Sequence, residues 1–116
     1  MKKIRKTYRE VNPELLYAEI RDFALKQGVK LGEAKLETFT LPDQSASFVT
    51  RGTLTFTGPR GAGGSEAECL RAHVVGSVRD ETKLMLDIEE KSFPAEKLAA
   101  LQEDIDFIFG AHEAKS

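Results

Sequence analysis

Three polar side chains near the centre of the sequence could form an acid–base group. Arg71 and His73 alternate with apolar neighbours, and Glu89 follows a later segment of the same kind. If these segments pair as antiparallel strands with Val78 opposite Leu84, His73 lies opposite Glu89, with Arg71 diagonal to it. A histidine beside a carboxylate can transfer protons when a pocket covers both groups. No further segment is left to act as a lid, so we favour the alternative of a solvated ladder of cross-strand charges.

A second pair, Cys69 and His73, has the residue types of a nucleophile and its base, or of two metal ligands. Both are expected on the solvent-facing side of one strand. Four residues at about 3.3 Å each then separate their backbones by roughly 13 Å. The only other histidine, His112, lies near the C-terminus. We therefore expect neither cysteine catalysis nor a metal site, and we predict no cofactor.

The glycine-rich stretch 58–65 (GPRGAGGS) invites comparison with phosphate-binding loops. A loop of the Walker type needs a Lys-Ser/Thr pair after its last glycine and a helix after that pair. Here Ser65 and Glu66 follow the last glycine, Gly64, and the next element is expected to be a strand. We interpret residues 58–66 as the mobile connection of a hairpin.

Apolar and polar residues alternate throughout the part of the chain that carries these groups. A period of two over this length predicts an antiparallel sheet with one buried and one solvated face. Two earlier segments have the composition of strands. The expected strands are 3–11, 33–41, 46–57, 68–79 and 83–92.

Two helices are expected, at 13–27 and at 94–109. Asn12 and Pro13 are typical of an N-cap and a first helical position, and Gly28 is a natural stop. The second helix carries an apolar stripe: Leu98, Leu101, Ile105, Ile108 and Phe109. The order is therefore β-α-β-β-β-β-α. It predicts an α+β two-layer sandwich, with an antiparallel sheet of about five strands and two helices packed on one face.

Length and composition limit the remaining possibilities. The 116 residues predict a single domain, 1–116, with residues 1–2 and 111–116 frayed. The net charge of −2 makes nucleic acid an unexpected partner, and no apolar run is long enough for membrane insertion. A single cysteine excludes an internal disulfide and fits a reducing compartment. Because no apolar stretch follows the basic first residues, we expect a cytoplasmic protein.

The solvent-facing side of the sheet is the first candidate for function. Three apolar residues (Val49, Val75 and Met85) interrupt its charged side chains, which favours a docking surface. The predicted interaction surface consists of Val49, Arg51, Arg71, His73, Val75, Met85, Asp87 and Glu89. Our first hypothesis is a protein-interaction module, self-associating through this face or through a free strand edge.

The alternative hypothesis is a small carrier or sensor that holds an apolar ligand between sheet and helices. Small side chains would make the buried face thin at four positions: Thr50, Gly52, Ala72 and Gly76. Aromatic residues such as Phe23, Phe56 and Phe109 could equally fill this space, and dense packing is the commoner outcome. An enzyme that uses Arg71, His73 and Glu89 is the third hypothesis.

Overall fold

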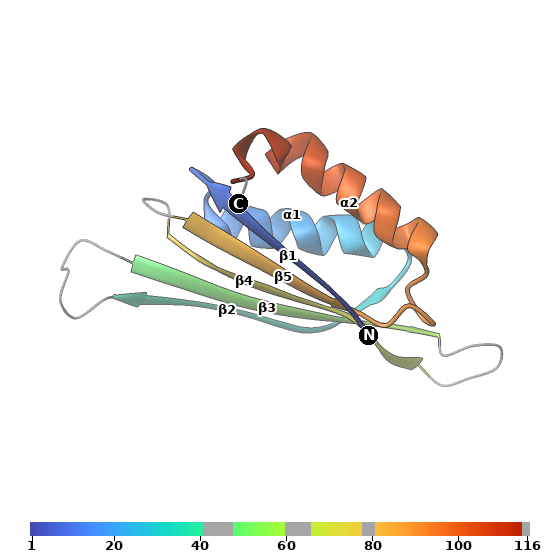
Figure 1. Cartoon of the computed structure of the whole chain (residues 1–116). Coiled ribbons are helices and arrows are strands. Elements are labelled where there is room, and N and C mark those ends of the chain that lie inside the picture. Colours follow the sequence, from blue (N-terminus) through green and yellow to red (C-terminus); the bar gives the residue numbers. More distant parts are fainter. Residues whose placement is uncertain (41–47, 60–65, 78–80, 115–116) are drawn as a thin grey trace.

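The computed structural model describes residues 1–40, 48–59, 66–77 and 81–114. Five strands form one antiparallel sheet in this part of the chain: β1 (Lys2–Arg9), β2 (Lys30–Thr40), β3 (Phe48–Pro59), β4 (Glu66–Gly76) and β5 (Glu81–Ile88). Both helices, α1 (Pro13–Lys26) and α2 (Ala95–Phe109), cover the same face of the sheet (Figure 1). The observed order β-α-β-β-β-β-α confirms the predicted α+β sandwich.

The strands are ordered β1-β5-β4-β3-β2 across the sheet. Helix α1 carries the chain from β1 at one edge to β2 at the opposite edge. The meander from β2 to β5 then returns to β1. As a result, the two edges of the sheet are formed by the first two strands of the chain.

The start and the end of α1 follow the signals in the sequence. The Asn12 side chain accepts a hydrogen bond from the Glu14 N–H at 2.8 Å, and Pro13 occupies the first turn. Gly28 adopts a φ of +88°, a backbone conformation that favours glycine and lets the chain turn into β2. The predicted N-cap is therefore confirmed.

The core lies between the helices and the inner face of the sheet. Gly52 allows α1 to approach closely, because a Cβ at this position would lie only 2.5 Å from Cδ2 of Tyr17. Apolar residues from β1, β3, β4 and β5 and from both helices are buried there. The largest of them are Tyr8, Leu16, Ile20, Leu54, Phe56, Leu70, Leu84, Leu86, Ile88, Phe93, Leu101 and Ile105.

The predicted register between β4 and β5 is wrong by four residues. Leu84 lies opposite Val74, and Gly76 lies opposite Thr82. The buried Thr82 hydroxyl donates a hydrogen bond to the Val11 carbonyl at 2.8 Å, and Gly76 leaves room for its side chain. These contacts start β5 at Glu81, earlier than the sequence predicts. A shift by an even number of residues keeps the apolar side chains on the inner face.

The chain ends are more ordered than expected. Strand β1 already begins at Lys2, and the short 3₁₀ helix Gly110–His112 follows α2. The Ala114 N–H then donates a hydrogen bond to the Thr7 carbonyl at 2.7 Å. Glu113 also forms an isolated bridge with Tyr8, so residues 113–114 lie beside β1.

The strand boundaries differ from those expected by one to four residues. β1 ends at Arg9, because Glu10 takes a φ of +59°. The glycine-rich stretch 58–66 is strand at both of its ends, where Pro59 closes β3 and Glu66 opens β4. Its predicted mobile part, 60–65, lies outside the described residues.

Candidate interaction surface

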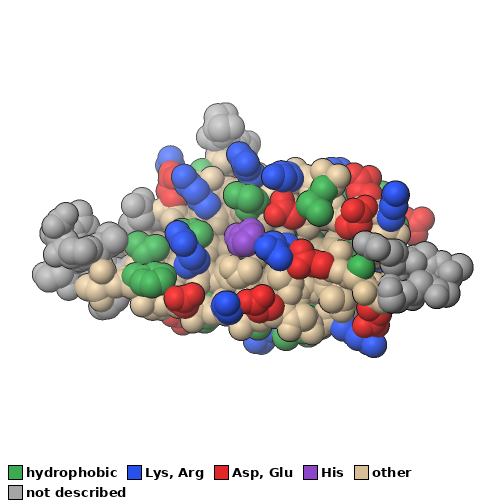
Figure 2. All heavy atoms as spheres, turned by 90° about the horizontal axis from the view of Figure 1, so that it is seen from below, with side chains coloured by type: hydrophobic (Ala, Val, Ile, Leu, Met, Phe, Trp, Pro, Cys, Tyr) green, Lys and Arg blue, Asp and Glu red, His purple; other side chains and the backbone are tan. Residues whose placement is uncertain are grey.

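The outer face of the sheet is the face opposite the helices, seen in Figure 2. Lys, Arg, Asp, Glu and apolar side chains are interspersed on it. The strand register sets rows of side chains across this face, and two adjacent rows carry four of the predicted residues. The first row contains Arg5, Met85, His73 and Thr53, and the second contains Thr7, Lys83, Val75 and Arg51. The structure thus brings together His73, Met85, Val75 and Arg51 of the predicted surface.

The predicted acid–base group is not assembled. His73 lies opposite Met85, and its Nδ1 atom is 3.4 Å from the Thr53 hydroxyl. Glu89 follows the end of β5, where its N–H donates to the Cys69 carbonyl at 2.9 Å. Four residues of β4 therefore separate Glu89 from His73, about 13 Å along the strand. The prediction of Glu89 opposite His73 is wrong, because it depended on the incorrect register.

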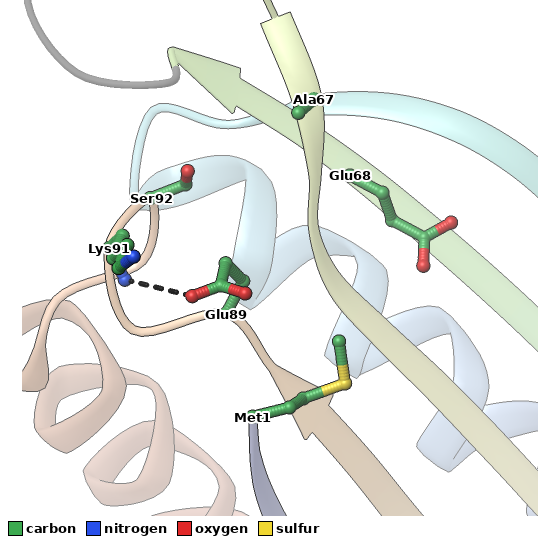
Figure 3. Close-up of a pocket in the computed structure, with 6 residues that line it drawn as sticks. All are labelled: Met1, Ala67, Glu68, Glu89, Lys91 and Ser92. Carbon is green, nitrogen blue, oxygen red and sulfur yellow. Dashed lines mark hydrogen bonds between the residues drawn. The ribbon is translucent and has the colours of Figure 1, made fainter.

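Glu89 instead lines a separate hollow of about 560 Å³ (Figure 3). Its carboxylate turns back to the Lys91 backbone N–H, at 3.4 Å. The Met1 side chain extends between Glu89 and Glu68 in this view, and the Glu68 carboxylate points away from Glu89. The two carboxylates that line this hollow therefore do not converge on a common point.

Charged side chains on the outer face are only partly paired. Arg71 forms a bidentate ion pair with Glu68, with N–O distances of 2.9 and 3.2 Å. This hydrogen-bonded carboxylate raises the pKa of Arg71. Asp87 lies between Lys3 and Arg71 in the register, yet its buried Oδ1 has no hydrogen-bond partner among the described residues. The ladder of cross-strand charges is thus incomplete.

Cys69 does not lie on the solvent-facing side. Leu70 pairs with Phe56 and Glu68 pairs with Thr57, so Cys69 is the extra residue of a β-bulge. Its side chain is turned into the core and is 1% exposed. Burial raises the pKa of the thiol, which disfavours the thiolate that a nucleophile or a metal ligand requires.

The four positions of the proposed apolar cavity are buried. Tyr17 lies over Gly52 and Thr82 lies over Gly76, each too close to leave room for a Cβ. The buried face is therefore filled at both glycines. The described residues also contain no group of three His, Cys, Asp or Glu side chains that could hold a metal ion.

Strand β2 is the most exposed element of the fold. All eleven of its residues are exposed, whereas every other strand contains buried residues. Helix α1 packs over β3 and β4 and reaches β2 with few contacts. Leu31, Leu36 and Phe39 are therefore 40%, 43% and 47% exposed. Sequence reasoning predicted a strand here but missed this surface.

The two edges of the sheet differ in how well they are protected. At the β1 edge the chain end pairs with Thr7, and Lys6 forms ion pairs with Asp106 at 3.0 Å and Glu113 at 3.2 Å. Burial lowers the pKa of Lys6, but hydrogen bonds to these carboxylates outweigh it and raise the pKa overall. At the β2 edge, no described segment pairs with the strand on its free side. An uncovered edge presents unpaired backbone N–H and C=O groups to other chains.

Comparisons with protein-family models, with curated proteins and with solved structures gave no match. None of the described helices is long and apolar enough to cross a membrane. A functional interpretation therefore has to start from the two surfaces just described, the outer face and the β2 edge.

Proposed function

We propose that this chain is a binding module that pairs with a second copy of itself along the free edge of β2. The observation that carries the proposal is the exposure of all eleven β2 residues. Edge strands are normally kept short, charged or covered, because an open edge recruits other strands. β2 is long and carries three exposed apolar side chains, so its edge is suited to such recruitment.

The side chains of β2 favour one register for this pairing. When two identical strands pair antiparallel about a two-fold axis at Leu36, the Leu36 side chains of both copies meet on the inner face. Lys35 of each copy then lies opposite Glu37 of the other, on the outer face. Two opposite-charge pairs therefore flank one apolar contact.

Neighbouring registers are less favourable. An axis at Lys35 would oppose the two lysines and would set Glu33 against Glu37. An axis at Ala34 would place the irregular stretch between Leu31 and Ala34 inside the new ladder. There the Glu33 N–H is already bonded to the Thr55 hydroxyl at 2.7 Å. The axis at Leu36 uses only the regular part of β2.

Charge inversion with rescue tests this register. Lys35→Glu or Glu37→Lys alone turns both opposite-charge pairs into like-charge pairs. Each exposed pair then changes from a gain of about 0.5 kcal/mol to a loss of about the same size. The two pairs together cost about 2 kcal/mol, which raises the dimer Kd roughly 30-fold. The double variant restores both attractive pairs and should recover the wild-type Kd in sedimentation equilibrium. Glu90→Lys, an exposed charge inversion outside β2, is the matched control.

Crosslinking provides an independent measurement. Leu36→Cys should form an intermolecular disulfide, because the two side chains meet at the axis. Ala34→Cys should not, because four residues of strand separate the two copies of this position. Cys69 is buried and gives little background. A strict monomer at millimolar concentration would refute the function. A dimer that ignores both charge inversion and Leu36→Cys would refute pairing along β2 in this register, and the dimer would then use another surface.

A further inference from the structure

A groove of about 550 Å³ crosses the outer face over β1, β5 and β4. It lies on the half of the sheet away from β2, so it is independent of the proposed pairing. The register directs six side chains onto the face that contains the groove: Arg5 and Thr7 from β1, Lys83 and Met85 from β5, and His73 and Val75 from β4. This volume is in the range of small-molecule sites.

The groove combines an apolar floor with unpaired positive charge. Val75 and Met85 are partly buried and supply the floor. Arg5 and Lys83 are exposed and form no ion pair with any described residue. Among the residues that the structure describes, no Asp or Glu lines the groove, and Asp87 lies one row further along β5, between Lys3 and Arg71.

The two cations can act on one ligand group. Lys83 lies opposite Thr7, two residues along β1 from Arg5, so the two positions are diagonal neighbours. Diagonal neighbours on adjacent strands are about 7–8 Å apart, within the combined reach of these two long side chains. His73 lies on β4, on the other side of Met85 from Arg5. Its Nδ1 atom faces the Thr53 hydroxyl, which leaves Nε2 for a ligand.

We propose that this groove binds a carboxylate that carries an apolar tail. The carboxylate accepts two parallel hydrogen bonds from the Arg5 guanidinium and one from the Lys83 ammonium group. The apolar tail lies on Val75 and Met85. A carboxylate is favoured over a phosphate, because phosphate sites draw on free backbone N–H groups. The backbone of β4 and β5 is paired on both sides within the sheet.

Octanoate is a suitable probe, followed by NMR of the Val75 and Met85 methyl groups. We expect octanoate to shift these signals, while acetate, which lacks the tail, binds at least tenfold more weakly. Octyltrimethylammonium has an apolar tail only one carbon longer and the opposite charge, and it should leave the signals unmoved. Equal effects of the anionic and cationic probes, or no shift with octanoate, would overturn the proposal.

Substitutions identify the residues responsible. Arg5→Gln and Lys83→Gln should each weaken octanoate binding about tenfold, since each removes one charge-assisted contact. Both side chains are exposed, so the fold should tolerate these changes. Arg21→Gln on α1 is the matched control and should bind like the wild type. Unchanged affinity in both groove variants would overturn the assignment.

Discussion

Replacing Gly52 by alanine should destabilise the fold, because the Tyr17 ring occupies the place that the methyl group needs. The new Cβ would lie 2.5 Å from Cδ2 and 3.0 Å from Cε2 of Tyr17, and 3.3 Å from Cδ1 of Leu36. Ordinary carbon contacts begin near 3.5 Å, so the ring would have to move by about 1 Å. Overpacking of this kind costs about 1–3 kcal/mol. Alanine regains about 0.5–1 kcal/mol over glycine in a strand, so the middles of the two ranges leave a net loss of about 1 kcal/mol.

Urea unfolding followed by circular dichroism measures this loss. The cause is tested by repeating Gly52→Ala in a Tyr17→Leu background, where the smaller side chain should reduce the cost to below about 0.5 kcal/mol. Gly110→Ala is the matched control. Gly110 has a helical φ of −58°, and its Cβ would lie 3.6 Å from that of Asp106. This control should be neutral or stabilising by about 0.4–1 kcal/mol. An unchanged midpoint for Gly52→Ala, or an equal loss without the tyrosine ring, would refute the reasoning.

Four further predictions concern Tyr8, Cys69 and the N-cap residue Asn12. Tyr8→Phe should leave the free energy of unfolding unchanged or raise it by up to about 1 kcal/mol. The reason is that the buried hydroxyl has no hydrogen-bond partner among the described residues. A loss above about 1 kcal/mol in urea unfolding would contradict this prediction. Because burial raises the pKa of Tyr8, the unfolded chain releases this proton first as the pH rises above 10. Stability should then fall by about 1.4 kcal/mol per pH unit, and Tyr8→Phe should fall less steeply in the same titration. Cys69 should react with a thiol reagent at pH 8 only after unfolding in urea, and rapid labelling of the folded protein would count against its burial. Asn12→Ala should cost about 1 kcal/mol, because the helix loses the cap on the Glu14 N–H, and an equal unfolding midpoint would show that the cap contributes nothing.

The features predicted correctly are those that local sequence determines. Alternation along β3, β4 and β5 shows which side chains face inward, whatever partner each strand has. Asn12 and Gly28 mark the limits of α1 through the backbone groups beside them. Phe107, which is not one of the residues of the predicted apolar stripe, is 89% exposed. Ile108, assigned to that stripe, is instead 43% exposed.

The incorrect predictions at Glu89 and Cys69 depend on how the strands pair, which local sequence does not determine. Glu89 was placed opposite His73 because the register of the β4–β5 hairpin was predicted incorrectly. The observed register is accompanied by the hydrogen bond from Thr82 to Val11, which are 71 positions apart. Cys69 was placed on the solvent-facing side because a strand without a bulge keeps strict alternation. Such irregularities leave no trace in apolar periodicity.

The two candidate surfaces were also found only in part. Arg5 was missed because β1 has mixed alternation, so neither its outward residues nor its pairing with β5 could be deduced. The exposure of Leu36 depends on how far α1 extends across the sheet. The sequence did contain one indication that β2 has no buried face. Leu36 and Phe39 have opposite parity, which is unusual for a strand with a single buried face.

The unequal protection of the two sheet edges has a consequence for the size of any assembly. A sheet with two open edges can add copies without limit and form a fibre. Here the β1 edge carries Lys2, Lys3, Arg5 and Arg9, and the Thr7 carbonyl is already bonded to the Ala114 N–H. Two copies joined at β2 would present only β1 edges, at both ends of a ten-stranded sheet. No further copy could add a strand at these edges, so the assembly would stop at the dimer.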